Sequence, residues 1–219
     1  FDYVAEDETF QANVAREARQ FLSRTQASPS LTVLCGGNEV AQQAAMFGLP
    51  PATWSNALFD KLLPVIARDI RPDLPYVPNT PWGGALPFVP DKGVSHYYGV
   101  SAYMRDLGDA RRAQVRFASE CLCFANVPDR SAVALETDRA ETKHVDFAPR
   151  IAGDTGATWY FDGVRNHYLE ALYGVSAEAL RQENPQRYLD LSRATSAEVM
   201  EHVFGEWRRA GSPTRGGLV

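Results

Sequence analysis

Apolar residues recur along the chain at two spacings, and the two spacings alternate. After an acidic start, apolar residues follow one another at helical spacing over 10–22, which predicts an amphipathic helix. The next apolar run, at 31–35, is short and continuous and predicts a buried strand. Helical spacing returns at 41–47. The pattern therefore predicts a strand enclosed between two helices.

The same alternation continues to the end of the chain. Because the predicted strands are short and apolar throughout, the pattern favours a parallel sheet covered by helices, which is an α/β fold. In such folds, ligands bind at the carboxyl ends of the strands. Further strands are predicted at 74–78, 94–100, 115–124 and 216–219. Helices are predicted at 58–66, with a kink at Pro64, and near 102–113. Two or three more helices are predicted over 162–210, the longest of them starting near Pro185.

Composition narrows the class of protein. The chain has 219 residues, of which 45% are hydrophobic and 22% charged, as in an ordinary globular protein. Its net charge of −5 argues against nucleic acid or an anionic membrane as a partner. It contains no run of about 18 apolar residues, which a membrane span would need. We expect neither a nucleic-acid nor a membrane partner, and the sequence does not address the oligomeric state.

Three cysteines bear on compartment and on metal binding. Cys35, Cys121 and Cys123 lie in apolar runs and are odd in number, which indicates free buried thiols. Free thiols favour a reducing compartment, and hence the cytoplasm. The three thiols and His96 lack metal-ligand spacing, because Cys35 belongs to a different strand from the other two. We therefore expect no metal and no cofactor.

Two glutamates follow apolar strands. In "SLTVLCGGNEV", residues 30–40, the strand is expected to break at two glycines and to deliver Glu39 just past its end. In "RFASECLCF", Glu120 ends another apolar strand, where a carboxylate is costly to bury unless it is paired or used. Two such carboxylates suit glycoside hydrolysis. The alternative is that each glutamate caps a helix or pairs with an arginine such as Arg116.

Four strand-end segments together resemble a known family. "LTVLCGGNEV", "YVPNTPWGG", "GVSHYYGVSAY" and "RFASECLCFANVP" are similar to the fourth to seventh barrel strands of family-two glycoside hydrolases, specifically the β-mannosidase-like members. That family typically shows W-C-G-N-N-E, H-Y-W and R-F-x-S-E on these strands. The resemblance implies that residues 1–219 form part of a (β/α)₈ TIM-barrel catalytic domain, from the fourth strand to the start of the eighth. The first strands and the family's β-sandwich domains would be absent.

The resemblance also implies roles for individual residues. It makes Glu39 the general acid/base and Glu120 the nucleophile. Asn38 matches the asparagine that hydrogen-bonds the sugar 2-hydroxyl, and His96 would line the same pocket. Tyr97 matches the tyrosine of H-Y-W, which implies that its hydroxyl binds the nucleophile and holds it ionised.

Some positions depart from the family pattern or have two interpretations. Gly37 replaces the first asparagine of N-N-E, Tyr98 replaces the tryptophan of H-Y-W, and "SECLCF" replaces the commoner S-E-F-G-F. These departures bear on which sugar is bound. Trp82 follows the predicted strand at 74–78 and is either a platform for a sugar ring or a packing residue. His144 and Asp146 lie in a long loop, for which solvent exposure is favoured over substrate contact.

The sequence thus predicts a retaining exo-β-glycosidase that hydrolyses terminal non-reducing β-mannosides, or a related β-glycoside, by double displacement. Its partner would be a carbohydrate substrate. The alternative is an inactive carbohydrate-binding or scaffold fragment of the same fold. Both ends of the chain, "FDY" and "GGLV", resemble cuts through structure, so we expect the chain alone to be poorly active and to expose an open sheet edge.

Overall fold

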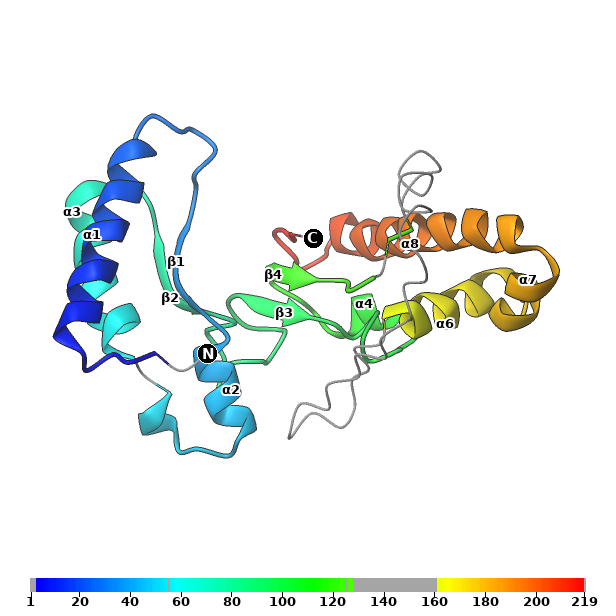
Figure 1. Ribbon diagram of the computed structural model, residues 1–219, viewed down its shortest axis with the longest axis horizontal. Helices are drawn as coiled ribbons and strands as arrows, with labels where there is room; N and C mark the ends of the chain where they lie inside the picture. The colour runs from blue at the N-terminus through cyan, green and yellow to red at the C-terminus, as the bar shows by residue number, and fades with distance from the viewer. Residues whose placement is uncertain (1–2, 55, 125, 128–160, 219) are drawn as a thin grey trace, which may run out of the picture. The chain divides into compact units, whose positions relative to one another are not determined.

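The computed structural model divides into two compact units, whose elements are labelled in Figure 1. The first unit comprises Phe1–His96 with Arg116–Ser119, and the second comprises Tyr97–Val115 with Glu120–Val219. The structure describes residues 3–54, 56–124, 126–127 and 161–218.

A parallel pair of strands organises the first unit. β1 (Leu34–Asn38) pairs with β2 (Tyr76–Thr80) in parallel, with Leu34 opposite Tyr76 and Asn38 opposite Thr80. A parallel pair requires a crossover connection, and helices supply it. This unit is therefore a βαβ arrangement, in keeping with the predicted α/β class. Its helices are α1 (Glu8–Arg24), α2 (Val40–Met46), the 3₁₀ helix η1 (Pro51–Thr53), the π-helix η2 (Leu58–Leu62) and α3 (Leu63–Ile70).

The core of the first unit lies where α1 and α3 pack beside the strands (Figure 1). Leu22 of α1, Leu34 of β1 and Ile66 of α3 are buried together there. Asp7 begins α1 by accepting a hydrogen bond from the backbone N–H of Phe10 at 2.7 Å, which satisfies one free donor of the first turn. The helix predicted over 10–22 is confirmed.

The strand predicted at 31–35 differs from the observed strand β1 in its position and in the role of its two glycines. Gly36 and Gly37 were expected to end that strand, but they lie inside β1, which begins at Leu34. A Cβ on Gly36 would lie 2.7 Å from the carbonyl oxygen of Pro78, and a Cβ on Gly37 would lie 2.8 Å from the ring of Phe59. The glycines therefore permit close approach within the sheet instead of a turn.

Pro64 also acts differently from the prediction. It was expected to kink one helix over 58–66, whereas it lies in the first turn of α3, directly after the π-helical η2. η2 runs directly into α3, and the N–H of Leu63, just before the proline, donates to the carbonyl oxygen of Leu58. The irregularity lies ahead of Pro64, where the backbone changes from π-helical to α-helical bonding.

Two short strands carry residues of both units. β3 (Ser95–Tyr97) and β4 (Ala118–Cys121) form a second two-stranded sheet. The backbone N–H of Ser95 donates to the carbonyl oxygen of Phe117 at 2.8 Å. Strands were predicted at 94–100 and 115–124, so both exist but are shorter than expected.

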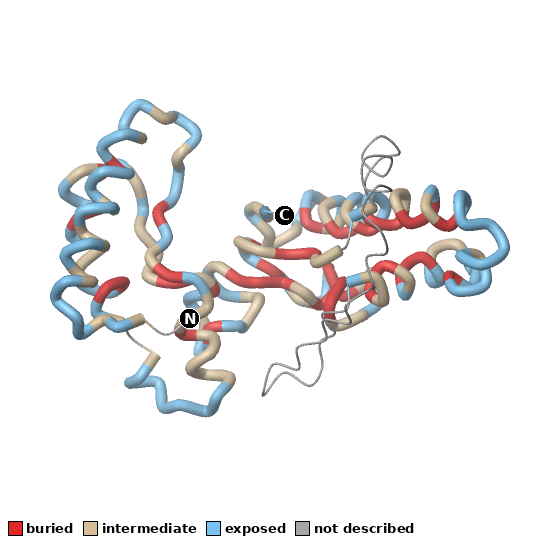
Figure 2. The backbone as a smooth tube through the Cα atoms, in the orientation of Figure 1, coloured by how far each residue is buried: buried red, intermediate tan, exposed pale blue. Residues whose placement is uncertain are grey.

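Helices make up most of the second unit. α8 buries one stripe of its surface, as the row of buried positions in Figure 2 shows. The side chain of Asn184 caps α8 by accepting from the N–H of Arg187 at 3.0 Å, and Pro185 is its first residue, as predicted. No helix of the described residues has the length and apolar character to cross a membrane. The helices are α4 (Asp109–Arg112), α6 (Phe161–Tyr173), α7 (Ala177–Glu183) and α8 (Pro185–Arg208).

Two elements of the second unit differ from prediction. The helix expected near 102–113 is reduced to α4, because Ser101 and Met104 adopt positive φ angles of 135° and 50° and interrupt a helix. Residues 216–218 form no strand beyond a single bridge position at Gly217. The carbonyl oxygen of Leu218, the residue after Gly217, accepts a hydrogen bond from the thiol of Cys121 at 3.1 Å.

The three cysteines are all free, as predicted, but they differ in burial. Cys121 is buried, Cys123 is half-buried and Cys35 is exposed. Burial raises the pKa of the Cys121 thiol to about 12, so it stays protonated at neutral pH. The prediction of a buried thiol is wrong for Cys35, because its side chain alternates away from the core that Leu34 enters.

Candidate active site

Glu39 occupies the position directly after the carboxyl end of β1, as the sequence predicts. Its backbone is left-handed, with φ 60° and ψ 6°, an uncommon conformation for a residue with a side chain. Its N–H donates to the carbonyl oxygen of Thr80 at 2.7 Å, which continues the β1–β2 pairing. Although Glu39 precedes α2 as its N-cap, its carboxylate makes no capping hydrogen bond. The backbone of Glu39 is therefore fixed by its bond to Thr80, and its carboxylate does not cap α2.

Two side chains of the first unit hold the Glu39 carboxylate. His96 Nδ1 lies 2.8 Å from Glu39 Oε1, and Gln42 Nε2 donates to the same oxygen at 3.0 Å. The His96 side chain is almost fully buried, whereas that of Glu39 is 20% exposed. An imidazole nitrogen either donates or accepts, according to the tautomer. His96 can therefore hydrogen-bond Glu39 in both protonation states of the carboxyl group.

Glu120 has a different partner, in the second unit. The hydroxyl of Tyr98 donates to Glu120 Oε2 at 2.7 Å. Glu120 is half-buried within β4, one residue before the end of the strand, and Leu122 just beyond it adopts a positive φ of 60°. A donor aimed at a carboxylate favours its ionised form. Within the first unit one glutamate thus lies beside a histidine, and within the second unit another lies beside a tyrosine.

The hydrogen bond expected between Tyr97 and Glu120 is not formed, and that prediction is wrong. The Tyr97 hydroxyl donates instead to Asp109 Oδ2 at 3.0 Å, and its ring packs edge-on against Trp207. Tyr97 is only 3% exposed, and burial with the neighbouring Asp109 carboxylate raises its pKa. Successive residues of an extended chain face opposite sides, so Tyr97 and Tyr98 reach different carboxylates. Tyr98 takes the place assigned to Tyr97.

The other predicted substrate-binding residues have distinct surroundings. Asn38 is exposed at the end of β1, and its Oδ1 accepts from the Thr80 hydroxyl at 3.2 Å. Trp82 is 48% exposed and does not act as a core packing residue. His144 and Asp146 lie outside the described residues.

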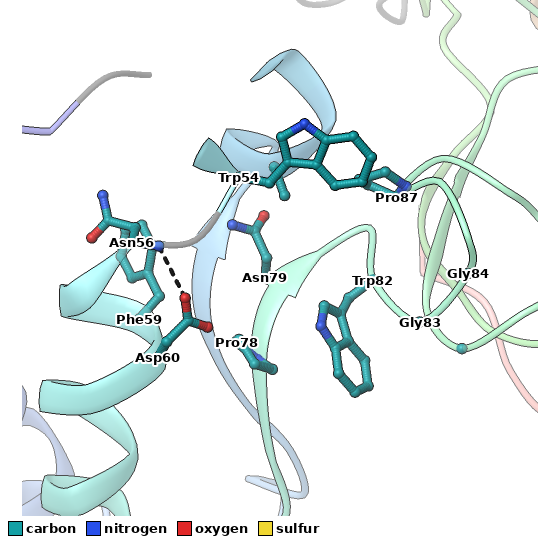
Figure 3. Close-up of a pocket in the computed structure, with 12 residues that line it drawn as sticks. Trp54, Asn56, Phe59, Asp60, Pro78, Asn79, Trp82, Gly83, Gly84 and Pro87 are labelled. Atoms are coloured by element: carbon teal, nitrogen blue, oxygen red, sulfur yellow. Dashed lines mark hydrogen bonds between the residues drawn. The ribbon is translucent and has the colours of Figure 1, made fainter. Parts of the chain in front are cut away.

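Trp82 lines a pocket within the first unit (Figure 3). The pocket has a volume of about 570 Å³, within the usual range for small-molecule sites. Trp54 and Asn79 also line it, whereas Glu39 and His96 do not. The structure therefore places Trp82 in a cavity that the Glu39–His96 pair does not share.

Sequence reasoning missed four residues that the geometry brings forward. Tyr98, the residue directly after β3, could have been found by allowing the H-Y-W tyrosine to fall one residue later. Gln42 follows Glu39 by three residues, the spacing of neighbours on a helix. Asn79 and Trp54 carried no such signal, because the fold alone brings them to Trp82.

Comparison with known proteins bears on the resemblance to β-mannosidases. No family model matches the chain. Two curated relatives, Beta-mannosidase B of Aspergillus flavus and Beta-mannosidase B of Aspergillus oryzae, are each 28% identical to it over 224 residues. The alignments cover 90% of this chain and 24% of each relative. The chain thus spans about a quarter of the length of the curated relatives that it matches.

A solved structure agrees with these relatives. The crystal structure of β-D-mannosidase from Dictyoglomus thermophilum superposes with a TM-score of 0.73 at 20% sequence identity, covering 97% of this chain and 25% of that one. The fold described here is therefore also found within a β-mannosidase. The curated relatives confirm the resemblance to β-mannosidases that the strand-end motifs predict, and the solved structure shows a similar fold.

Proposed function

We propose that the chain carries the catalytic carboxylates of a retaining exo-β-glycosidase, with Glu39 as general acid/base and Glu120 as nucleophile. The observation that carries the proposal is that His96 and Tyr98, two residues apart, each hydrogen-bond one of the two glutamates. Alternate residues of an extended strand face the same side. That spacing supports the proposal that both carboxylates serve one reaction.

The surroundings of Glu39 suit a residue that loses and regains a proton. A general acid must deliver its proton to the leaving oxygen and then accept one from water. Gln42 and His96 both reach Oε1, so Oε2 is the oxygen that would carry the catalytic proton. Oε1 is an acceptor in both protonation states of the carboxyl group, so Gln42 and an Nδ1–H tautomer of His96 can stay bonded to it through both steps.

The surroundings of Glu120 suit a residue that attacks as an anion. The Tyr98 hydroxyl donates to Oε2 and would stabilise the negative charge before attack. When Glu120 forms an ester with the sugar, the charge disappears and that hydrogen bond weakens. The same phenol then stabilises the carboxylate again as it departs, which assists release of the sugar.

The reaction that follows has two balanced steps. Glu120 attacks the anomeric carbon while Glu39 gives its proton to the glycosidic oxygen, so the glycosidic bond breaks and a glycosyl ester forms. Glu39 then removes a proton from water, whose oxygen attacks the anomeric carbon and releases the Glu120 carboxylate. Two inversions give net retention of the anomeric configuration.

We further propose terminal β-mannosides as substrates and a (β/α)₈ barrel as the setting. The names of the curated relatives support the substrate, and the exposed Asn38 amide supports contact with a sugar 2-hydroxyl. The parallel β1–β2 pair with its helical crossover supports the barrel. The residues of the motifs support family-two glycoside hydrolases in particular.

Covalent labelling tests the assignment of the nucleophile in the enzyme that contains this chain. A 2-deoxy-2-fluoro-β-mannoside with a dinitrophenolate leaving group slows release of the intermediate, so mass spectrometry of peptides is expected to find the label on Glu120. Labelling of Glu39 would reverse the two roles. Labelling of neither would remove the covalent mechanism and favour a binding or scaffold role for the chain.

Azide rescue tests the acid/base assignment. In a Glu39→Ala variant, an activated aryl mannoside needs no proton, so the glycosyl-enzyme forms but its hydrolysis lacks a base. Added azide is expected to restore turnover and to give a glycosyl azide of retained configuration. Rescue of a Glu120→Ala variant with an inverted product, and no rescue at Glu39, would contradict the proposal.

A further inference from the structure

We propose that the pocket lined by Trp54, Asn79 and Trp82 is a separate binding site for a neutral saccharide unit. It lies in the first unit and goes beyond the proposed function, which needs none of these three residues for chemistry. In Figure 3 the amide of Asn79 is drawn between the two indoles. We call this cavity the tryptophan pocket.

Hydrogen bonds hold the indole of Trp54 and the backbone of Trp82 in the tryptophan pocket without a ligand. The Trp54 Nε1–H donates to the carbonyl oxygen of Leu49 at 2.9 Å, which fixes the ring. The backbone of Trp82 is fixed by two hydrogen bonds with Val94, of 2.8 and 2.9 Å, while nearly half of its surface stays exposed. Gly93 permits this bridge, because a Cβ there would collide with the Trp82 carbonyl oxygen. Rigid aromatic surfaces bind at a low entropic cost.

Asn79 supplies a polar group that the fold leaves unsatisfied. The residue is only 5% exposed, and its Oδ1 has no hydrogen-bond partner among the described residues. A buried acceptor without a partner costs about 1–3 kcal/mol, so such atoms are uncommon in native proteins unless they serve a ligand or water. Asn79 faces the pocket, where an O–H donor would satisfy its oxygen.

Gly37 links this pocket to a departure from the family motif. A Cβ at Gly37 would lie 3.1 Å from Asn79 Nδ2, as well as against the ring of Phe59. An asparagine at position 37, as in N-N-E, would therefore displace Asn79 or Phe59. The glycine and the position of the Asn79 amide are consistent with each other, so both belong to one local arrangement.

The polar groups of the pocket select the class of ligand. Asp60 adds a carboxylate, which disfavours phosphate and other anions, and Asn56 adds a second amide. Acceptors between flat apolar rings suit a molecule that has several hydroxyl donors and an apolar face. A pyranose ring has both features, whereas an aromatic ring such as nitrophenol has the flat face but few donors.

Titration of the full chain with β-1,4-mannotriose tests the proposal, with binding followed by ligand-observed NMR and by calorimetry. Asn79→Leu and Trp82→Ala are each expected to raise the Kd about tenfold or more, since one hydrogen bond or one aromatic face is lost. Asn13→Leu and Phe47→Ala, an exposed asparagine and an exposed aromatic outside the pocket, are matched controls and are expected to bind as the parent chain does.

Stability gives a second measurement on the same variants. Because Asn79→Leu removes an unsatisfied buried acceptor, its Tm is expected to stay level or rise while binding is lost. Trp82 is exposed, so Trp82→Ala is expected to fold normally. These expectations separate loss of binding from loss of folding.

Three outcomes would overturn the proposal. The first is the absence of mannotriose binding, and the second is equal binding of 4-nitrophenol and mannotriose with the same response to Trp82→Ala. The third is binding that survives both pocket substitutions but is lost in Glu39→Gln, because the sugar would then occupy the proposed catalytic site. That third result would leave the proposed function standing while removing the tryptophan pocket as a site.

Discussion

Glu39 and Glu120 are the same residue type beside a strand end, yet their surroundings differ in one chemical respect. Glu39 contacts a histidine that can donate or accept, together with a glutamine that donates. Glu120 contacts a tyrosine hydroxyl that donates. Donors gathered on one oxygen of Glu39 leave its other oxygen to lose and regain the proton, whereas a donor to Glu120 suits a group that attacks as an anion. Identical carboxylates can thus be distinguished by the partners that the chain gives them.

Substitution of the glutamates themselves is expected to have the largest effect on this comparison. In the enzyme that contains this chain, Glu120→Ala is expected to abolish turnover of every aryl mannoside. Glu39→Ala is expected to lower kcat by about 10²–10⁴-fold with a poor leaving group and much less in the first turnover of dinitrophenyl mannoside. Steady-state and burst kinetics with a series of leaving groups measure this difference. Equal sensitivity of both variants to the leaving group would contradict the two roles.

The adjacent tyrosines provide a matched pair. Tyr98→Phe removes the donor to Glu120 and is expected to lower kcat by about 10–100-fold, as for loss of a hydrogen bond to a charged group, with little change in unfolding free energy. Tyr97→Phe removes a buried bond to Asp109 and is expected to cost about 1–3 kcal/mol of unfolding free energy. Its kcat per folded molecule is expected to stay close to that of the parent.

Kinetics and chemical denaturation of both variants distinguish the two tyrosines. If Tyr97→Phe lowered kcat more than Tyr98→Phe did, then Tyr97 would be the residue that matches H-Y-W after all. The role proposed for Tyr98 would then belong to Tyr97.

Substitution of Gly37 tests whether the close packing of β1 beside Glu39 requires a glycine. Gly37→Ala brings a Cβ within 2.8 Å of Phe59 and is expected to destabilise the chain by about 1–3 kcal/mol through overpacking. Gly205→Ala is the matched control, because nothing lies within 4 Å of its Cβ and the residue belongs to α8. That control is expected to stabilise by about 0.5–1 kcal/mol. Urea denaturation measures both changes, and a neutral Gly37→Ala would show that close approach does not require the glycine.

A surface ion pair of the second unit gives the smallest expected effect. The Arg111 guanidinium hydrogen-bonds the Glu206 carboxylate at 2.7 Å and lowers its pKa below the ordinary value of 4.5. A carboxyl group whose pKa is lower in the folded state contributes stability above its unfolded pKa and loses it as pH falls through the folded pKa. Glu206→Gln is therefore expected to lower Tm slightly at pH 7 and not at all at strongly acid pH. A difference in Tm that persists at low pH would indicate that packing, not charge, is lost.

The sequence predicted element types better than their edges. The helix at α1 and the strand–Glu39–helix succession followed from periodicity, because the apolar spacing and Asp7 define them locally. Periodicity did not predict that β1 would include Gly36 and Gly37, because their close contacts with Phe59 and Pro78 involve residues far away in the chain.

In the candidate site, too, local sequence predicted some features, whereas others depended on residues far away in the chain. Asn38 and Glu39 were located by local sequence, but the choice between Tyr97 and Tyr98 depended on a strand register shifted by one residue. The pocket around Trp82 requires Trp54 and Asn79 from separate elements, and no local pattern predicts such a meeting. Motifs therefore identify residues, and the fold decides their partners.

The separation of the two carboxyl groups in a crystal structure of the enzyme tests the central claim most directly. A retaining mechanism predicts carboxyl groups of Glu39 and Glu120 about 5–5.5 Å apart in one cleft, with the Tyr98 hydroxyl on Glu120. A separation of about 6.5–9.5 Å would indicate an inverting enzyme and contradict Glu120 as nucleophile. Carboxyl groups that face different clefts would contradict the shared site itself.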